Sequence, residues 1–508
     1  MALATTLTRA QFGVDAPQVK VEVHIGNGLP SFSLVGLPET SVKEAKERVR
    51  SALINSGFEF PMRRITVNLA PAELPKQGGR YDLPIAIAIL AASGQIPPSS
   101  LKDTEFAGEL SLSGQINGCS GLLPTLVAAK NAQHRLIIPI ENHADAELVG
   151  HQACYLAGHL QQVSDYLHGR TELANSANQP HWIEQSLPND ALCLSDIIGQ
   201  HQAKQALEIA AAAEFNLLLV GPPGTGKTML ANRILPLLPA LNYQEALEVA
   251  SLYSIAGMTL TPAQLRQRPF RNPHHTSSAI SLVGGGSQPQ PGEISLAHKG
   301  VLFLDELAEF PRKVLDSLRE PLETGEVVIS RAKAKLNFAC QFQLIAAMNP
   351  SPCGDVEGQR RSTPDQVLRY LSKLSGPFLD RFDLSIEVPK LPSGSLSQAN
   401  SQSGETTLQV RERVLRARQA QLDRQGTLNK YLAGKALDHA CQLSASDRQF
   451  LESSIEKLGL SVRSFHRIMK VSRTIADLQQ SSIVERRHVA QALSFRAMDR
   501  LLHNLNQY

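Results

Sequence analysis

The chain has 508 residues, of which 42% are hydrophobic and 19% are charged, and its formal net charge is +3. A chain of this length and composition is expected to form two or three soluble domains with well-packed cores. A net charge so close to zero excludes nucleic-acid binding by a global positive field, so any such binding has to come from local basic patches.

The spacing of the cysteines and the length of the apolar runs indicate in which cellular compartment the protein is expected. The six cysteines are scattered without a CxxC pair, which argues against a disulfide framework or a zinc ribbon and favours a reducing environment. Residues 1–13 lack the apolar core of a signal peptide, and the apolar run at residues 83–92 is too short to span a bilayer. We therefore expect a cytoplasmic protein with no membrane partner.

The first part of the chain predicts a mixed α/β domain. Apolar and polar side chains alternate over residues 19–25 and again over residues 63–71, as expected of half-buried strands. Residues 81–92 predict a buried helix. Between the two strands, residues 41–57 predict another helix, which we expect to begin with a capping box of Ser41 and Glu44 and to stop at Gly57.

Loose polar stretches divide the chain into parts. Residues 168–190 and a Ser- and Gln-rich stretch from residue 393 predict linkers. The tail beyond the second linker predicts helices only, because Ile468, Val471, Ile475 and Leu478 recur at three- and four-residue spacing. The expected division is an N-terminal domain at 1–167, a linker at 168–195, a core at 196–392, a linker at 393–408 and a helical domain at 409–508.

The segment NLLLVGPPGTGKTML, residues 216–230, matches a P-loop that follows an apolar strand. Backbone N–H groups of such a loop surround phosphates, while Lys227 reaches the β- and γ-phosphates and Thr228 ligates Mg²⁺. The alternative, a Gly-Pro turn that only joins a strand to a helix, requires a chance match to five fixed positions. The residues expected to bind ATP here are Gly221, Pro222, Pro223, Gly224, Thr225, Gly226, Lys227 and Thr228.

A second acidic motif, GVLFLDELAEF, places Asp305 and Glu306 at the end of a predicted buried strand. Asp305 is expected to act as an outer-shell ligand of the Mg²⁺ held by Thr228, and Glu306 to orient or deprotonate the attacking water. Acidic strand ends are common by themselves. Asp305 and Glu306 follow a P-loop at the separation found here, and this favours a catalytic role for them.

Three more polar residues are candidates for the same site. Asn349 follows a third predicted strand, where an amide can hold the attacking water or the γ-phosphate. Arg381 lies between Asp380 and Asp383, which can pair with it locally; in a ring it can instead reach a neighbouring subunit's γ-phosphate. The sequence leaves both the local pairing of Arg381 and its contact with a neighbouring subunit open. Arg463 begins a tail helix and can contact nucleotide from above, although most such arginines are only solvated.

The segment GEVVISRAKAKLNF, residues 325–338, carries Arg331, Lys333 and Lys335 at alternate positions. On a strand these three cations fall on one face, and at the tip of a hairpin they gather at its end. Either arrangement needs an anionic partner or open water, and the residue pattern leaves both open.

His274 and His275 are adjacent, and adjacent strand residues point in opposite directions, which argues against a shared metal site. We favour a loop that senses nucleotide or DNA, with a structural role as the alternative.

The order GPPGTGKT, FLDE, AAMNP, GPFLDRFDL and a tail with VRSFHR resembles the AAA+ ATPases related to magnesium chelatase. Longer stretches, among them RPFRNPHHTSSAISLVGGG and LREPLETGEVVISRA, resemble the ComM/YifB family over essentially the whole chain. The resemblance implies an α/β protein with an N-terminal Lon-protease-like (ribosomal S5 domain 2-like) domain. A P-loop AAA+ core with a parallel sheet and a C-terminal helical lid follow it.

The same resemblance implies an ATP- and Mg²⁺-dependent homo-hexamer that moves on single-stranded and branched DNA. Members act in natural transformation by promoting branch migration during recombination of incoming single-stranded DNA, with recombination proteins as candidate partners. The resemblance makes Asn349 sensor 1, Arg381 the trans arginine finger and Arg463 sensor 2. The alternative is a protein remodeller similar to a magnesium chelatase subunit, and a non-enzymatic scaffold is a third class. The basic segment lies where helicase-type relatives insert a hairpin, and its lack of aromatic residues between residues 325 and 337 favours DNA phosphate over polypeptide or stacked bases.

Two departures from the relatives matter. Only Cys353 remains of a cysteine cluster that follows the AAMNP strand in many of them, so we expect no structural metal there. In the N-terminal domain, residues 77–84 contain no serine and Leu123 stands near the lysine position of a Ser–Lys dyad. We therefore expect a scaffold and not a peptidase.

Overall fold

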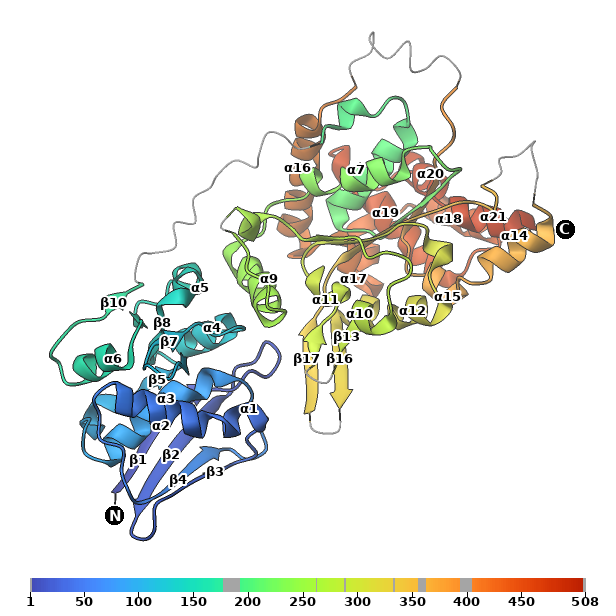
Figure 1. The fold of residues 1–508 in the computed structure, drawn as a ribbon. Coiled ribbons are helices and arrows are strands. Elements are labelled where there is room, and N and C mark those ends of the chain that lie inside the picture. The colour runs from blue at the N-terminus through green and yellow to red at the C-terminus, as the bar shows by residue number, and fades with distance from the viewer. Residues whose placement is uncertain are drawn as a thin grey trace.

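The computed structural model describes residues 2–176, 192–261, 263–286, 289–331, 334–354, 362–392 and 404–505. Figure 1 shows the N-terminal part, blue to cyan, on one side of helix α9 (Tyr243–Ile255) and the rest of the chain, green to red, on the other. Within the described ranges, every helix is too short or too polar to cross a membrane.

The N-terminal part is built on a mixed eight-stranded sheet with the order β10-β9-β8-β5-β1-β2-β4-β3. Its strands are β1 (Ala2–Arg9), β2 (Gln18–Gly26), β3 (Ser31–Val35), β4 (Arg64–Ala70), β5 (Thr104–Phe106), β8 (Arg135–Pro139), β9 (Cys154–Ala157) and β10 (Ala174–Asn175). Every second residue of β2 is buried, at Val19, Val21, Val23 and Ile25, which confirms the predicted half-buried strand.

Helices cover both faces of this sheet, because the strand residue Ile137 is buried in one hydrophobic cluster with helices and its neighbours Leu136 and Ile138 are buried in another. They are α1 (Thr40–Lys43), α2 (Ala45–Asn55), α3 (Asp82–Ala92), α4 (Leu123–Asn131), α5 (His143–Val149) and α6 (Leu160–Leu167). Every residue of α3 is buried, as predicted from its unbroken apolar sequence. The predicted capping box is wrong, because a short helix already begins at Thr40 and the longer one restarts after Glu44. The helix stop is confirmed, since Gly57 follows the last turn with a φ of 83°.

The core is a parallel five-stranded sheet with the order β12-β15-β18-β11-β19. Its strands are β12 (Phe270–Arg271), β15 (Val301–Leu304), β18 (Gln343–Met348), β11 (Leu217–Val220) and β19 (Leu384–Glu387). Helices of the core are α7 (His201–Ala213), α8 (Lys227–Asn232), α9, α10 (Ala279–Val283), α11 (Glu293–Leu296), α12 (Arg312–Ser317), α13 (Arg319–Thr324), α14 (Pro364–Leu371) and α15 (Gly376–Leu379). Because both faces of the sheet are covered, its three middle strands are buried along their whole length, as their continuous apolar sequences predict.

Two small antiparallel ribbons project from the core. One pairs β13 (Gly284–Gly285) with β14 (Gln290–Pro291). The other is a hairpin of β16 (Glu326–Arg331) and β17 (Ala334–Ala339), in which Arg331 pairs with Ala334 and Ser330 with Lys335. The single-strand alternative for Arg331, Lys333 and Lys335 is therefore wrong, because the chain turns back between the first and the last of them. The hairpin-tip alternative is confirmed for the backbone, and Lys333 itself lies outside the described residues.

The C-terminal part is helical, as predicted, and consists of α16 (Thr407–Gln425), α17 (Gly434–Cys441), α18 (Ala445–Lys457), α19 (Val462–Leu478), α20 (Arg486–Ser494) and α21 (Ala497–Leu505). The apolar stripe of α19 is buried at Ile468, Val471 and Ile475 in the same hydrophobic cluster as strands β11 and β15. Helix α16 lies along α7, where Arg418 donates to the Ala211 carbonyl at 2.9 Å.

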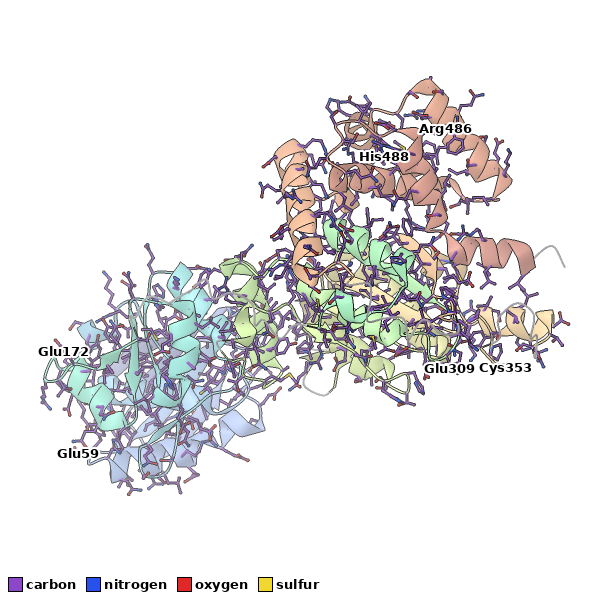
Figure 2. The ribbon with its side chains drawn as sticks, turned by 90° about the horizontal axis from the view of Figure 1, so that it is seen from above. Glu59, Glu172, Glu309, Cys353, Arg486 and His488 are labelled. Atoms are coloured by element: carbon purple, nitrogen blue, oxygen red, sulfur yellow. The ribbon has the colours of Figure 1, made fainter. Side chains whose placement is uncertain are left out.

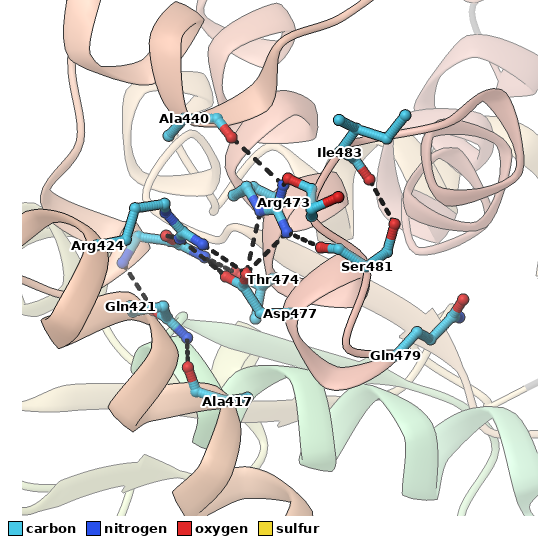
Figure 3. Close-up of polar contacts among 12 residues, drawn as sticks. Ala417, Gln421, Arg424, Ala440, Arg473, Thr474, Asp477, Gln479, Ser481 and Ile483 are labelled. Carbon is cyan, nitrogen blue, oxygen red and sulfur yellow. Dashed lines mark hydrogen bonds and ion pairs between the residues drawn. The ribbon is translucent and has the colours of Figure 1, made fainter.

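A buried polar network joins three of these C-terminal elements (Figure 3). The Asp477 carboxylate of α19 accepts from both Arg424 of α16 (2.6 and 3.0 Å) and Arg473 (2.8 Å), and from the Asn429 amide (2.8 Å). Asn429 belongs to a single 3₁₀ turn, Asn429–Tyr431. Burial of a carboxylate is costly unless it is paired in this way, and here each of its oxygens accepts more than one hydrogen bond.

Among the described residues, the N-terminal part contacts the core at helix α9 and at the hairpin. Tyr243, at the start of α9, donates its hydroxyl hydrogen to the Val149 carbonyl at 2.8 Å. Phe12 and Val14, in the turn between β1 and β2, pack against the hydrophobic cluster that includes Phe338 of the hairpin. The first contact lies beside α9, and the second reaches the hairpin itself (Figure 1).

Candidate functional site

The predicted site residues meet at the carboxyl edge of the parallel sheet. Strands β15, β18 and β11 are neighbours, so the residues that follow them, Asp305, Asn349 and Gly221, come out at one edge. In open parallel sheets ligands bind outside the carboxyl ends of the strands. The strand order thus brings together motifs that are 77 and 122 residues apart along the chain.

Two glycines shape the P-loop. Gly221 passes so close to strand β19's end that an added Cβ would lie 2.3 Å from the Val388 carbonyl oxygen. Gly226 caps helix α8 with a φ of 85°, a conformation that side chains disfavour. The loop therefore needs glycine at both positions, at Gly221 for the close approach to Val388 and at Gly226 for the start of helix α8.

Lys227 is the central cation of the site and is only 9% exposed. Its ammonium donates to the carbonyls of Gly221 (2.7 Å) and Pro222 (2.8 Å) and to Asn349 Oδ1 (3.2 Å). Burial lowers the pKa of Lys227, and the nearby carboxylates of Asp305 and Glu306 partly oppose that shift. The contact with Asn349 joins the P-loop to the predicted sensor, as expected of one shared site.

Thr228 and Asp305 form the second contact of the site. The Thr228 hydroxyl donates to Asp305 Oδ2 at 2.7 Å, and Asp305 Oδ1 accepts from the Glu306 N–H at 2.9 Å. A hydroxyl oxygen beside a carboxylate suits the oxygen ligands that Mg²⁺ prefers. These residues fit a Mg²⁺ ion that Thr228 would bind directly, with Asp305 behind it.

Glu306 is held by a residue that sequence reasoning did not connect with it. His275 Nδ1 lies 3.1 Å from Glu306 Oε2. The premise used for His274 and His275 is wrong, because they lie in a turn and not on a strand, and their rings are only 4.1 Å apart. No local pattern around His275 indicated Glu306 as its partner, since the two lie on segments that meet only in the folded sheet.

Arg381 pairs with neither of the aspartates that flank it. Its guanidinium contacts the Glu323 carboxylate. Asp380 lies 3.6 Å from Arg467, and Asp383 accepts from a backbone N–H. The local-pairing alternative is therefore wrong, because both carboxylates take other partners.

Arg381 is one member of a cluster of positive charge. Burial lowers the pKa of Arg381, and the charges of Arg467, Arg463 and Arg319 lower it further. Arg463 is exposed at the start of α19. The structure thus brings Arg463 near Arg381, an association that their separation in the sequence did not suggest.

The cations of the hairpin lie at a different place in the fold from the residues that are expected to bind ATP. Lys335 is exposed on β17, and Arg331 closes β16. The body of the hairpin is fixed to the core by Val327, Ile329 and Phe338, which are buried in one hydrophobic cluster. The base is therefore anchored, and strands β16 and β17 project from the core (Figure 1).

The two departures from the relatives can also be located. Cys353 is exposed at the side of the core remote from Glu59 and Glu172 of the N-terminal part (Figure 2). Across the described ranges, no three His, Cys, Asp or Glu side chains are placed to hold a metal ion. In the N-terminal part, Arg80 donates to the Ser120 carbonyl at 2.6 Å, so the loop at 77–84 does lie beside the segment that contains Leu123.

Comparison with known proteins identifies three matching family models along the chain. They are described as magnesium chelatase, subunit ChlI, over residues 193–396; subunit ChlI of Mg-chelatase, over residues 21–142; and magnesium chelatase, subunit ChlI C-terminal, over residues 404–496. The chain is 55% identical to competence protein ComM of Haemophilus influenzae, over the full length of both chains. It is 51% identical to YifB of Escherichia coli, over 100% of this chain and 99% of that one. Over 38% of its length it is 26% identical to the magnesium-chelatase 38 kDa subunit of Cereibacter sphaeroides, of which 58% is covered.

Proposed function

The chain belongs to the ComM/YifB family of magnesium-chelatase-like AAA+ proteins, and from that premise we propose that it is an ATP-driven motor that moves on DNA. The proposed substrates are single-stranded and branched DNA, and the proposed task is branch migration during recombination of incoming DNA. The name of the Haemophilus relative, a competence protein, supports this assignment.

We propose the domain division given by the sequence, at 1–167, 196–392 and 409–508, with linkers at 168–195 and 393–408. Two separate sheets and a helical C-terminal part support it. The matched family models, which begin at residues 21, 193 and 404, support the same division.

Hydrolysis of ATP would use the contacts at the carboxyl edge of the core sheet. Lys227 offsets phosphate charge. Thr228 and Asp305 would hold a Mg²⁺ ion, which when bound would supply a Lewis acid for the phosphate charge. Glu306 accepts a proton from the attacking water, and Asn349 orients that water or the γ-phosphate. The contact of Asn349 with Lys227, 3.2 Å long, is the observation that supports one shared site for binding and chemistry.

A ring of subunits is proposed because the arginines of this cluster outnumber the carboxylates that contact them among the described residues, which are Glu323 for Arg381 and Asp380 for Arg467. Arg381 lies near Arg319, Arg463 and Arg467, and Glu323 is the carboxylate that contacts it. A γ-phosphate of a neighbouring subunit would supply the missing negative charge, as a trans arginine finger requires. Because Arg463 lies near Arg381, we propose that both act on the same neighbouring nucleotide, in a homo-hexamer.

The proposed DNA contact is the tip of the hairpin β16–β17, with Arg331, Lys333 and Lys335. Contacts with phosphate are independent of base sequence, which suits a motor that moves along any DNA. The rival proposal is a protein remodeller, which the similarity to the magnesium-chelatase 38 kDa subunit favours. A basic tip is better suited to phosphate than to an apolar polypeptide.

ATP hydrolysis with and without DNA tests the proposal. We expect DNA, single-stranded or branched, to raise the turnover of ATP, whereas a protein remodeller would be indifferent to it. Replacing Arg331, Lys333 and Lys335 together with Ala should leave basal hydrolysis intact and reduce stimulation by DNA. The slope of log Kd against log salt should become shallower by about one unit for each phosphate that the variant no longer binds. Stimulation at the parent level in the triple variant would instead identify these cations as a solvated face.

A further inference from the structure

The turn between β1 and β2 is the point at which the N-terminal part reaches the hairpin. Phe12 and Val14 of this turn pack, partly buried, against the hydrophobic cluster that contains Phe338 of β17. Between them, an added Cβ on Gly13 would lie 3.5 Å from the Asn337 carbonyl oxygen and 3.9 Å from the Phe338 Cε1 atom. The turn therefore lies directly against strand β17, in contact with both its backbone and its side chains.

The backbone of this turn is closed by hydrogen bonds of its own. The Ala10 N–H donates to the Pro17 carbonyl at 2.9 Å, and the Phe12 N–H donates to the Asp15 carbonyl at 3.2 Å. Gly13 has a φ of 60°, a conformation that side chains disfavour. The turn thus presents its two apolar side chains from a fixed backbone.

The hairpin depends on packing because a two-stranded ribbon by itself is only marginally stable in water. Its strand β16 is contacted by the ribbon β13–β14, where an added Cβ on Gly284 would lie 3.0 Å from the Ile329 Cδ1 atom. Its strand β17 is contacted by the turn between β1 and β2. Arg331 and Lys335 belong to strand pairs that lie nearer the tip than these contacts. The body of the hairpin is therefore held through both strands, behind the cations.

The N-terminal part is attached to the core independently of the hairpin. Leu247 and Ala250 of α9 are buried in the same hydrophobic cluster as Leu123 and Leu126 of α4. The Tyr243 hydroxyl adds its hydrogen bond to this interface. The turn between β1 and β2 is thus held against the hairpin by a domain whose position is fixed at α9.

We propose that the N-terminal part is a brace for the hairpin β16–β17, and that Phe12 and Val14 are positioning residues that keep the hairpin ordered for DNA. This inference rests on the proposed function, because DNA is the proposed ligand of the hairpin. Groups that are ordered before binding lose less conformational freedom when they bind, so a braced hairpin has the higher affinity. The N-terminal part thereby takes part in DNA binding without contacting DNA through these two residues.

Phe12→Ala combined with Val14→Ala removes the two side chains that pack against the hairpin cluster. The hydrogen bonds of the turn join backbone atoms, so the pairing of β1 with β2 should persist. Without DNA, amide hydrogen exchange in peptides from β16 and β17 should become at least about tenfold faster, because exchange reports local opening. Mass spectrometry measures this exchange, and peptides from β2 and β4 should exchange as in the parent.

The same variant should bind DNA less tightly. For a single-stranded oligonucleotide of mixed sequence, its Kd should rise at least about threefold, because the loosened hairpin loses more freedom on binding. At a fixed, subsaturating concentration of this oligonucleotide, the stimulation of ATP turnover should fall accordingly. Basal turnover and the KM for ATP should stay within about twofold of the parent values, since neither residue lies at the edge of the core sheet that carries the P-loop.

Two matched variants separate packing of the turn from a general effect of substitution. Phe12→Leu combined with Val14→Ile keeps apolar side chains in the turn, and it should retain slow exchange in the hairpin and the DNA affinity of the parent. Leu29→Ala removes a leucine of the N-terminal part that is 89% exposed, and it should change neither.

The outcomes distinguish this inference from the proposed function. If DNA neither binds nor stimulates the parent, the proposed function fails, whereas hydrogen exchange still measures the brace. Unchanged exchange of β16 and β17 in the double alanine variant would refute the brace. Faster exchange of the hairpin with unchanged DNA affinity would refute its role in DNA binding. Faster exchange of β2 and β4 as well would show that the turn serves the fold of the N-terminal part, and this would also overturn the inference.

Discussion

Lys227 and Glu306 carry opposite charges in one site, but the structure holds them differently. The Lys227 ammonium is buried and donates to three oxygens, two of them carbonyls of the P-loop itself. The Glu306 side chain is 58% exposed and is held by His275. We infer that Lys227 contributes to binding in the ground state, whereas Glu306 contributes only when water attacks.

At the residue scale, Lys227→Ala should abolish productive binding of ATP, whereas Glu306→Gln should bind ATP and hydrolyse it about 10²–10⁴-fold more slowly. Equilibrium binding of a fluorescent ATP analogue and single-turnover hydrolysis measure the two effects separately. Hydrolysis at the parent rate by Glu306→Gln would remove Glu306 from the catalytic role.

The network around Asp477 shows how separate elements are tied together. Its carboxylate joins α16, the 3₁₀ turn at Asn429 and α19, and the side chains of Asp477 and Arg473 are 2% and 1% exposed. Removing one partner of a buried ion pair leaves the other charged and unpaired, which is more costly than the net value of the pair. The exposed pair of Asp438 with Arg448, 2.8 Å long, offers a comparison in the same helical region.

At the element scale, Asp477→Ala should lower the free energy of unfolding of the helical part by about 3–5 kcal/mol, because it leaves Arg473 and Arg424 without their carboxylate. Asp438→Ala should cost less than about 1 kcal/mol, since its pair is solvent-exposed. Urea denaturation followed by circular dichroism measures both. Equal losses of stability in the two variants would show that burial of the Asp477 network does not determine how much it contributes to the free energy of unfolding.

At the scale of the whole molecule, the P-loop with Glu306 and the proposed arginine finger Arg381 lie in different places. The P-loop and Glu306 lie at the carboxyl edge of the core sheet, while Arg381 follows helix α15 and contacts Glu323 at the end of α13. A subunit that supplies its arginine to a neighbour needs a complementary surface on that neighbour. Function in a ring therefore depends on residues from two copies of the chain.

At this scale, Arg381→Ala alone should lose about 10³–10⁵-fold in ATP turnover, as expected for a trans arginine. Mixing it with Lys227→Ala should restore part of the activity, because some interfaces then combine an intact P-loop with an intact arginine. Turnover is followed across a series of mixing ratios, with mixed rings verified by native mass spectrometry. Mixed rings that remain inactive at every ratio would indicate that Arg381 serves its own subunit through Glu323.

The sequence alone determined the features that depend on neighbouring residues. The P-loop, the Asp305-Glu306 strand end and the buried helix α3 follow from local patterns of glycine, charge and apolar residues, and the structure contains each of them. Strand periodicity was likewise sufficient for β2, because alternation is set by the pleat of one strand. The parallel core sheet was also predicted and is confirmed by the strand order.

Only the tertiary structure decided which distant side chains meet. His275 with Glu306, and Arg381 with Glu323, are contacts between segments that the fold brings together, and the local sequence pointed to other partners. The three hairpin cations were ambiguous for the same reason, since one alternating pattern fits both a strand and a turn until the pairing partner is known. Local sequence specifies backbone geometry within an element, whereas contacts between elements depend on strand order and packing, which no short segment contains.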